Sequence, residues 1–559
     1  MNTKDIAIIG GGPAAMFMFK RIVESGNNQV RVAIFEKNDR LGAGLPYSAA
    51  GANPEHVTNV SANEIPEIYQ GMLEWLRSAP ASVLERYDID PQNFSAYKVF
   101  PRLLFGRYLS DQFDIFLEKA AQIGIKTDVH LNTAVHDILP QKKGLFKIVT
   151  DKGDFVATDT IICSGHFWPP HVSLPSGYFD SPYPPSKLAL QINHTVGIKG
   201  ASLTAIDAIR TLSRHNGEFF KDGNRLRYAV NKDCNDFKMV LHTRNGFLPA
   251  VRFHLEDPHL FRQSVLSEAE IAEHRQNNNN FISLDFVFEK NFKELFKDKD
   301  PGFYAQIKDL SLEAFVDKMM ELREALDPFV LLEAEYEQAE KSIRRKESIL
   351  WKEQLAVLSF TLNPPAKYFC AEDMLRLQKV LMPLISLIIA FIPQSSCLEL
   401  LALHKSGRLE LIAVGEDGTI EPGEHSGATV TFTQSDGRVV RQHYQTFVDC
   451  TGQPHLPIEA FPFKGLLEAE LLAPATVEFA DKANAASRDN VLYYADKAFL
   501  KVPGAAINDH FQVADIFGAA IPNLYIMAVP HIGGYNPDYS GLDFCESASE
   551  KVIKTLLPS

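Results

Sequence analysis

One segment near the start of the sequence constrains the fold more than any other. Residues 6–36 read IAIIGGGPAAMFMFKRIVESGNNQVRVAIFE. An apolar run typical of a buried parallel strand leads directly into a G-x-G-x-x-A turn, and a helical stretch follows over 14–24. A second apolar strand over 30–35 ends in Glu36. This order of elements predicts a β-α-β unit whose turn binds a dinucleotide.

Each position of the turn has a chemical reason. Gly10 lets the chain turn tightly out of the strand, and Gly12 has no Cβ, so a pyrophosphate can approach the backbone. Ala15 lets helix and strand pack closely, and the helix N-terminus directs free N–H groups at the phosphates. Glu36 is placed to accept hydrogen bonds from ribose hydroxyls, and its charge disfavours a 2′-phosphate, so we expect FAD or NAD rather than NADP. The other expected contacts of this turn are Pro13, Ala14 and Lys37.

The residues beyond the acid favour FAD. Gly42 and Gly44 follow it closely, in a pattern that resembles the two-dinucleotide-binding-domain flavoproteins, where this turn wraps the adenosine half of FAD. TIICSGH at 160–166 and FVDCTGQP at 447–454 resemble that family's strands ending in Ala-Thr-Gly, which pass the chain between its two nucleotide domains. The resemblance implies further FAD contacts at Ser164 and Gly165.

Other segments resemble a bacterial subfamily of FAD-NAD(P)-binding proteins, distantly similar to flavin-containing and N-hydroxylating monooxygenases. They are GLPYS, HVTNVSA, FPRLLFGRYL, LTAID and, near the C-terminus, NLYIMAVPHIGG. The resemblance implies that Asn59, in the second of these, approaches the flavin. In many relatives the last segment ends in Gly-Asp, and Val529-Pro530 stands in that place here, which makes Pro530 a candidate cofactor contact.

A second strand–turn–helix pattern near residue 200 reads TVGIKGASLTAIDAIRTLSRHNG. Its turn is G-x-S-x-x-A, with Gly200 first and Ser202 where a pyrophosphate would approach the backbone. The next strand, KMVLHTR, ends in Arg244, a cation placed for a 2′-phosphate. Two interpretations stay open: the module binds NADPH or NADH with Ser202 donating to a phosphate, or it is structural only. The residues of this second candidate site are Gly200, Ser202, Thr204 and Arg244.

These features predict an α/β fold with two Rossmann-like (three-layer ββα) nucleotide-binding domains and a mainly helical insertion. We expect a discontinuous FAD-binding domain over 1–180 and 447–559, and a second, NAD(P)-binding-like domain over 190–255 and 398–446. Residues 256–397 have helical apolar spacing and form the insertion. The insertion is either a lid over the substrate or a packing or dimerisation element.

Composition and short patterns exclude several other classes. A net charge of −14 repels phosphate backbones, so nucleic acid is not an expected partner. The longest apolar run, 380–392, is too short to span a bilayer. The six cysteines form no C-x-x-C pair and no export signal opens the sequence, which predicts reduced thiols in the cytoplasm. The histidines have no metal-ligand spacing, so no metal site is expected.

The function these features favour is an FAD-dependent oxidoreductase acting on a small molecule, in first place a monooxygenase reduced by NADPH or NADH. No catalytic residue is assigned, and structural roles are favoured for Cys163, His166, Cys450, His531 and Tyr535. The class B monooxygenase fingerprint F-x-G-x-x-x-H is missing from SGYFDSPYPP, which favours N-hydroxylation or another flavin oxidation over a Baeyer–Villiger reaction. The alternatives are an oxidase or dehydrogenase reduced by its own substrate, and a non-catalytic binding protein that keeps the fold.

Overall fold

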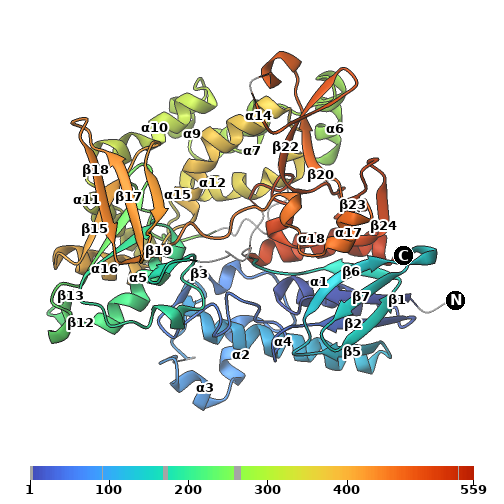
Figure 1. Cartoon of the computed structure of the whole chain (residues 1–559), viewed down its shortest axis with the longest axis horizontal. Coiled ribbons are helices and arrows are strands. Elements are labelled where there is room, and N and C mark those ends of the chain that lie inside the picture. The colour runs from blue at the N-terminus through green and yellow to red at the C-terminus, as the bar shows by residue number, and fades with distance from the viewer. Residues whose placement is uncertain are drawn as a thin grey trace.

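The computed structural model describes residues 4–90, 92–167, 174–256, 266–486, 488–538 and 541–558. Two parallel sheets organise the chain (Figure 1). The first sheet has the strand order β5-β2-β1-β9-β24-β23, and only β23 runs antiparallel to its neighbour. Its strands are β1 (Lys4–Ile9), β2 (Val30–Phe35), β5 (Lys126–His130), β9 (Asp159–Ile162), β23 (Gln512–Ala514) and β24 (Ala520–Ile526).

Helices and a small antiparallel sheet cover the two faces of this first sheet. Helix α1 (Pro13–Glu24) packs against α18 (Gly541–Leu556) and α4 (Arg102–Gln122), and their apolar side chains share one core with the strands. On the other face, Phe155 packs edge-on against Phe35, with ring centroids 5.0 Å apart. Phe155 belongs to the sheet of β6 (Val135–Pro140), β7 (Phe146–Thr150) and β8 (Gly153–Ala157). The predicted three-layer ββα arrangement is confirmed.

The second sheet repeats this plan on a smaller scale. Its order is β10-β19-β11-β14-β15, and all its neighbouring strands are parallel. Helix α5 (Leu203–Asn216) follows β11, and the antiparallel strands β16 to β18 pack on the sheet through a small core that contains Val240, Phe432 and Tyr444. The strands are β10 (Tyr178–Phe179), β11 (Thr195–Lys199), β14 (Lys238–Thr243), β15 (Leu409–Ala413), β16 (Thr419–Pro422), β17 (Ala428–Thr433), β18 (Val439–Tyr444) and β19 (Thr446–Asp449).

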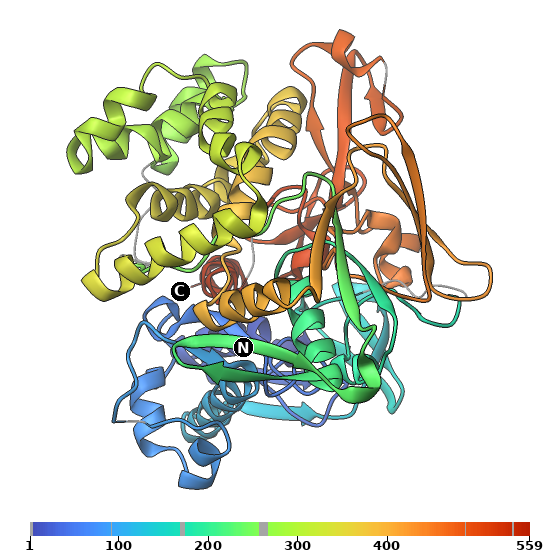
Figure 2. The same cartoon turned by 90° about the vertical axis from the view of Figure 1, so that its left-hand side faces the viewer.

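The insertion is helical throughout its described part and forms one body above the N-terminal unit (Figure 2). Its buried apolar side chains belong to the same contiguous core as those of the second sheet and α5. This shared core joins the insertion to the second module. The helices are α6 (Glu268–Asn277), α7 (Leu284–Asn291), α8 (Phe296–Lys299), α9 (Pro301–Ile307), α10 (Leu312–Ala325), α11 (Pro328–Arg345), α12 (Leu350–Thr361), α13 (Asn363–Ala366), α14 (Ala371–Arg376), α15 (Met382–Ile389) and α16 (Gln394–Lys405).

The structure corrects two expected domain boundaries and shows how a further strand pairs. The predicted start of the C-terminal FAD segment at 447 falls inside β19, and β19 pairs with β11, so residues 446–449 belong to the second sheet. Likewise β10, placed by the sequence in the first domain, pairs with β19. The residues around 409–413 alternate apolar and polar side chains, a pattern that also suits a hairpin, but β15 joins the parallel sheet beside β14. Strand patterns near a crossover do not show which sheet a strand joins, because that depends on a partner far away in the chain.

Residues 474–505 form a further antiparallel sheet that the sequence did not predict. It has the order β20-β22-β21, and its Val477 and Leu500 lie in the core shared by the insertion and the second module. The strands are β20 (Pro474–Glu478), β21 (Val491–Tyr494) and β22 (Lys497–Ala505). The remaining elements are β3 (Val57–Ser61), α2 (Met72–Ser78), α3 (Ala81–Glu85), β4 (Val99–Pro101), β12 (Gly217–Asp222), β13 (Arg225–Val230) and α17 (Lys464–Glu468).

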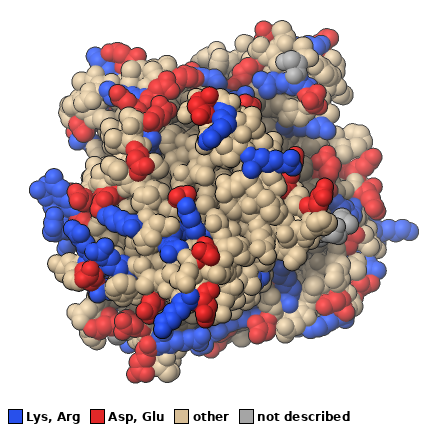
Figure 3. All heavy atoms as spheres, turned by 60° about the vertical axis from the view of Figure 1, so that its left-hand side comes forward, with Lys and Arg blue, Asp and Glu red and all other residues tan. Residues whose placement is uncertain are grey.

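Charges of both signs are distributed over the surface. On the face in Figure 3, lysine and arginine side chains lie among aspartates and glutamates, so the net charge of −14 forms no continuous acidic face there. Within the part of the chain that the structure describes, no helix is both long and apolar enough to cross a membrane.

Candidate dinucleotide-binding sites

The first candidate site lies where the strand order of the first sheet reverses. β2 and β5 lie on one side of β1, while β9 and β24 lie on the other. In open α/β sheets, ligands bind outside the carboxyl ends of the two strands at such a switch point. The turn after β1 and the segment after β9 are therefore brought together, and they carry the predicted residues Gly10, Gly12, Ser164 and Gly165.

The glycine turn has the geometry that a pyrophosphate requires. Gly10 has φ +103°, and a Cβ there would lie 2.7 Å from the carbonyl oxygen of Cys163. Gly12 is the N-cap of α1 and no side chain caps the helix, so the N-terminus is open to an anion. A Cβ on Gly12 would lie 3.4 Å from Cα of Gly44, inside the space between the turn and the following loop. Pro13 occupies the first helical turn, and Ala14 and Ala15 follow it.

Glu36 contacts the backbone of this turn. Its carboxylate accepts hydrogen bonds from Gly11 N (2.8 Å) and from Asn38 N and Nδ2 (2.8 and 2.7 Å). Each carboxylate oxygen can accept two hydrogen bonds, so Oε2 keeps one position for a ribose hydroxyl. Gly11, which the sequence reasoning missed, has no room for a side chain, since a Cβ would lie 2.4 Å from Cδ2 of Leu41. Lys37 is exposed beyond the acid.

The loop after Glu36 turns back over the motif. Gly42 N–H donates to the Gly11 carbonyl at 2.7 Å, which fixes the loop against the glycine turn. Gly42 and Gly44 have φ values of +90° and +57°, where L side chains are strained. Ser164 Oγ, on the opposite wall, is buried and lacks a hydrogen-bond partner among the described residues. An open helix N-terminus, side-chain-free walls and an orphaned hydroxyl fit a bound diphosphate, so these residues fit FAD.

Two further predicted cofactor contacts, Asn59 and Pro530, accept hydrogen bonds from other segments through their backbone carbonyls. The Asn59 carbonyl accepts a hydrogen bond from the Arg252 guanidinium. Pro530 lies in a buried 3-10 turn, and its carbonyl accepts from Leu456 N at 2.8 Å.

The residues weighed as structural mostly have structural partners. The Tyr535 hydroxyl donates to the Thr476 carbonyl at 2.9 Å. Burial raises the pKa of the Cys163 and Cys450 thiols, so neither is an activated nucleophile. His531 is buried beside Phe461, with ring centroids 4.8 Å apart, and burial lowers its pKa to about 4. Its Nε2 atom has no partner among the described residues.

The second candidate site occupies the corresponding switch point of the second sheet, between β11 and β19. Gly200 has φ +98° and donates its N–H to the His242 carbonyl at 2.8 Å. Ser202 is the exposed N-cap of α5, and its hydroxyl makes no cap hydrogen bond. Thr204 Oγ1 lies 3.4 Å from the position that a Cβ on Gly452 would occupy. The serine therefore leaves the N-terminus of α5 open.

Charged side chains stand at the carboxyl ends of the same strands. Arg244 is 67% exposed after β14 and pairs with Glu416 at 3.5 Å. Lys199, which ends β11, pairs with Asp449 of β19 at 3.0 Å. Both cations lie on the side of the sheet where the phosphates of a nucleotide would bind.

A side chain joins the two sites directly. The amide of Gln453 accepts from Phe167 N at 2.7 Å and donates to the Phe167 carbonyl at 2.8 Å. Phe167 follows β9 and Gln453 follows β19, so this amide pairs the two exit segments. His455, which the sequence reasoning also missed, packs over Gly533, where a Cβ would lie 1.7 Å from its Nδ1 atom. The carboxyl ends of the two sheets thus meet at one place.

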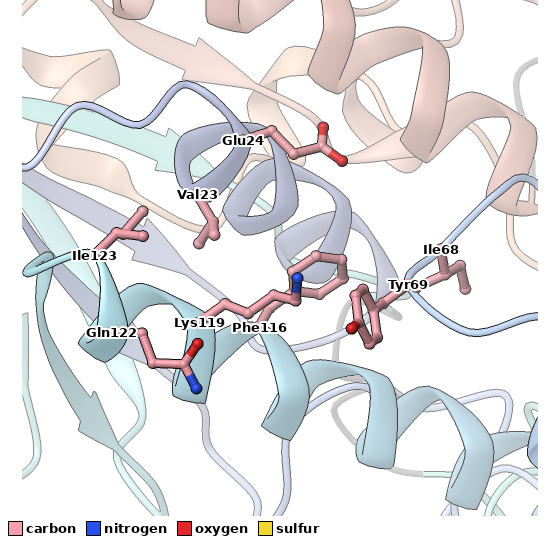
Figure 4. A pocket seen from close by; sticks show the side chains of 8 residues that line it. All are labelled: Val23, Glu24, Ile68, Tyr69, Phe116, Lys119, Gln122 and Ile123. Carbon is pink, nitrogen blue, oxygen red and sulfur yellow. The ribbon is translucent and has the colours of Figure 1, made fainter.

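A surface cavity lies away from both candidate sites. It has a volume of about 280 Å³ and lies at the opposite end of α1 from Gly12, beside Val23 and Glu24 (Figure 4). Two of its lining residues form a cation–π contact, with Lys119 Nζ 4.0 Å from the centre of the Tyr69 ring. No group of three or more potential metal ligands was found in the part of the chain that the structure describes.

Two Rossmann-like sheets, each with a glycine turn at its switch point, define an α/β flavoprotein fold with two dinucleotide-binding units and a helical middle domain. Comparison with known families agrees: residues 7–167 match the family described as FAD-NAD(P)-binding, and residues 267–389 match the family described as YdhS-like middle domain. The chain is similar to the uncharacterized protein YdhS of Escherichia coli (strain K12), with 28% identity over 469 residues, covering 83% of this chain and 86% of the relative. The predicted resemblance to FAD-NAD(P)-binding proteins is confirmed.

Solved structures of similar fold include two monooxygenases. The cadaverine monooxygenase DfoA of Erwinia amylovora, bound to FAD, has a TM-score of 0.48 and 10% identity, covering 99% of this chain and 94% of that chain. L-lysine 6-monooxygenase of Pseudomonas syringae has a TM-score of 0.46 and 14% identity, covering 99% of both chains. Both likenesses are remote.

Proposed function

We propose that this protein is an FAD-dependent oxidoreductase that acts on a small molecule and takes its electrons from NADPH or NADH, in the manner of a monooxygenase. The observation that carries the proposal is the Gln453–Phe167 pair, since it brings the exit segments of the two nucleotide units into contact. A flavin at the first site and a nicotinamide at the second would then approach each other at this junction.

Each group of residues has a role in this proposal. The N-terminus of α1 and Gly12 bind the diphosphate of FAD, Glu36 holds its ribose, and the loop of Gly42 and Gly44 covers its adenosine half. FAD, when bound, supplies the electron-transfer and oxygen chemistry. The N-terminus of α5 binds the phosphates of the nicotinamide nucleotide, with Ser202 donating to one of them. Arg244 meets a 2′-phosphate, which favours NADPH over NADH.

We further propose that the insertion forms a fixed wall of the substrate pocket. Its core is continuous with that of the second module, so a lid that swings open on its own would have to break that core. The domain division proposed from the sequence is kept with β10 and β19 moved to the second module.

The test begins with the colour of the purified protein. We expect the two visible absorption bands of flavin, either at once or after incubation with FAD, and loss of the longer-wavelength band when NADPH is added under argon. A flavin that is bleached by neither NADPH nor NADH favours the oxidase or dehydrogenase reduced by its own substrate. A colourless protein that rejects added FAD supports the non-catalytic binding protein and refutes the proposal.

A further inference from the structure

Three of the segments that carry the family resemblance meet at a buried joint that the proposed cofactor sites do not use. His56 comes from HVTNVSA, Arg102 from FPRLLFGRYL and Asp207 from LTAID. The first two belong to the FAD-binding unit, and Asp207 lies in α5 of the second unit. Side chains far apart in the sequence therefore connect the two units at this place.

The centre of the joint is a buried ion pair. The Asp207 carboxylate accepts hydrogen bonds from the Arg102 guanidinium and, at 2.6 Å, from the Tyr183 hydroxyl. Arg102 also donates through Nε to the Val57 carbonyl at 3.0 Å, so its orientation is fixed by the backbone of β3. The side chains of Asp207 and Arg102 are 5% and 14% exposed. A buried pair with these hydrogen bonds permits few alternative arrangements, because each partner left alone would be an uncompensated charge.

A neutral histidine extends the joint along α5. Nε2 of His56 lies 3.1 Å from the Asp207 carbonyl and 3.1 Å from Thr211 Oγ1. Thr211 in turn donates to Glu55 at 3.1 Å. Burial lowers the pKa of His56, which keeps it neutral near pH 7. Two consecutive turns of α5 are thus held to the FAD-binding unit.

Two arginines on the neighbouring part of the same helix face connect α5 to the insertion. Arg210 donates to Ser396 Oγ at 2.7 Å, and Glu399 Oε1 accepts from Arg210 Nη2 at 3.2 Å and from Arg214 Nη2 at 2.7 Å. Ser396 and Glu399 belong to α16 at the end of the insertion. Helix α5 therefore contacts both the FAD-binding unit and the insertion through buried charged side chains, and it cannot move without breaking them.

We propose that Asp207 is a positioning residue that sets the distance between the two nucleotide sites, and that the protein transfers electrons without rotation of its second unit. The proposal rests on the proposed function, in which NADPH gives a hydride to FAD and a proton from solvent completes FADH₂, leaving NADP⁺. Asp207 lies five positions after Ser202, about 7.5 Å along the helix at 1.5 Å per residue. The joint thus holds the helix end that receives the nucleotide's phosphates.

The test compares Asp207→Asn with a control at another largely buried carboxylate. Asp207→Asn keeps the shape but removes the charge, and Tyr183→Phe is a milder second variant that removes one hydrogen bond. Glu335→Gln is the control, since Glu335 forms a buried ion pair with Arg323 and Lys352 inside the insertion, at 2.7 and 2.9 Å, away from the joint. Each variant is purified, its bound FAD is measured, and its thermal midpoint is recorded.

The first readout is the rate of flavin reduction by saturating NADPH in a stopped-flow instrument under argon. We expect Asp207→Asn to keep its FAD and its absorption spectrum but to be reduced about ten- to a hundredfold more slowly, since a displacement of 1 Å between reacting groups has this effect. Glu335→Gln lowers the thermal midpoint but is reduced at the wild-type rate. Wild-type rates in both Asp207→Asn and Tyr183→Phe, or an equal loss in Glu335→Gln, would overturn the proposal.

The second readout does not depend on reduction. Spin labels at Val156→Cys in β8 and Phe220→Cys in β12, both exposed, report the distance between the two units in a Cys370→Ser background, because the other native cysteines are buried. We expect one narrow distance distribution that NADP⁺ does not shift, and a broader one in Asp207→Asn. A shift with NADP⁺, or no broadening in the variant, refutes the fixed joint. If the wild-type flavin is not reduced by either nucleotide, the proposed reductant is wrong, and this distance measurement alone judges the joint.

Discussion

Replacing Gly12 by alanine separates cofactor binding from folding. Gly12 has φ −79°, which alanine adopts without strain, and the added Cβ would lie 3.4 Å from Cα of Gly44, at van der Waals contact. At Gly10, by contrast, φ is +103° and a Cβ would lie 2.7 Å from the Cys163 carbonyl oxygen. The two glycines stand two positions apart in one turn, yet only Gly10 is required by the fold itself.

The expected magnitudes follow from this geometry. Gly12→Ala should change the free energy of unfolding of the apoprotein by less than about 1 kcal/mol. Alanine is a weaker N-cap than glycine, which lowers stability, but it also restricts the unfolded chain, which raises stability. Gly10→Ala should cost at least about 1–3 kcal/mol from backbone strain. With Cβ in the path of the diphosphate, Gly12→Ala loses one or two hydrogen bonds to a charged group, each contributing about 1.5–3 kcal/mol, so FAD affinity falls about 10- to 100-fold or more.

The assay has two parts. FAD binding to the apoprotein is titrated through quenching of flavin fluorescence, and urea unfolding of the apoprotein gives the stability. We expect Gly12→Ala to be folded and pale, and Gly10→Ala to be destabilised. A Gly12→Ala protein that is purified with a full complement of FAD and binds it as tightly as the wild type would refute the assignment of this turn to the diphosphate.

Two further predictions concern the second site and the buried histidine. Arg244→Ala should raise the NADPH concentration for half-maximal flavin reduction about tenfold, because the variant loses the cation that would meet the 2′-phosphate. The corresponding NADH concentration should not change, because NADH has no 2′-phosphate and Arg244 pairs with the exposed Glu416 in the structure. Equal effects on both nucleotides would contradict this role of Arg244. His531 has a pKa of about 4 when folded, against 6.5 in the unfolded chain, so the unfolded state gains a proton first and stability is lost as the pH falls from about 6.5 to 4. The His531→Phe variant keeps a ring beside Phe461 but has no titrating group, so it should lose less stability between pH 7 and pH 4.5 than the wild type. Urea unfolding midpoints at the two pH values measure this loss. An unchanged pH dependence would show that His531 does not cause it.

The glycine turn after β1 could be predicted because its signals are local. The strand, Gly10, Gly12, α1 and Glu36 lie within one continuous segment, and each residue type is required by the conformation of its own neighbourhood. The second turn was found in the same way, and the structure shows that Ser202 leaves the helix end open. The insertion's helices followed from apolar periodicity, which needs no knowledge of tertiary contacts.

Other features depended on partners that the sequence does not identify. Gln453 and Phe167 are 286 positions apart, and Arg102 and Asp207 are 105 apart, so no local pattern marks either pair. The sheet that β19 joins and the core that β20 and β22 complete were decided in the same way.

The amino-acid sequence by itself determined the two nucleotide turns and the helical character of the insertion, since turn chemistry and periodicity act within a few residues of each other. Only the tertiary structure decided that the segments leaving β9 and β19 meet and that α5 contacts both the N-terminal unit and the insertion through buried charges. The physical reason is that a buried charge is stable only beside its partner, and the fold alone brings those partners together.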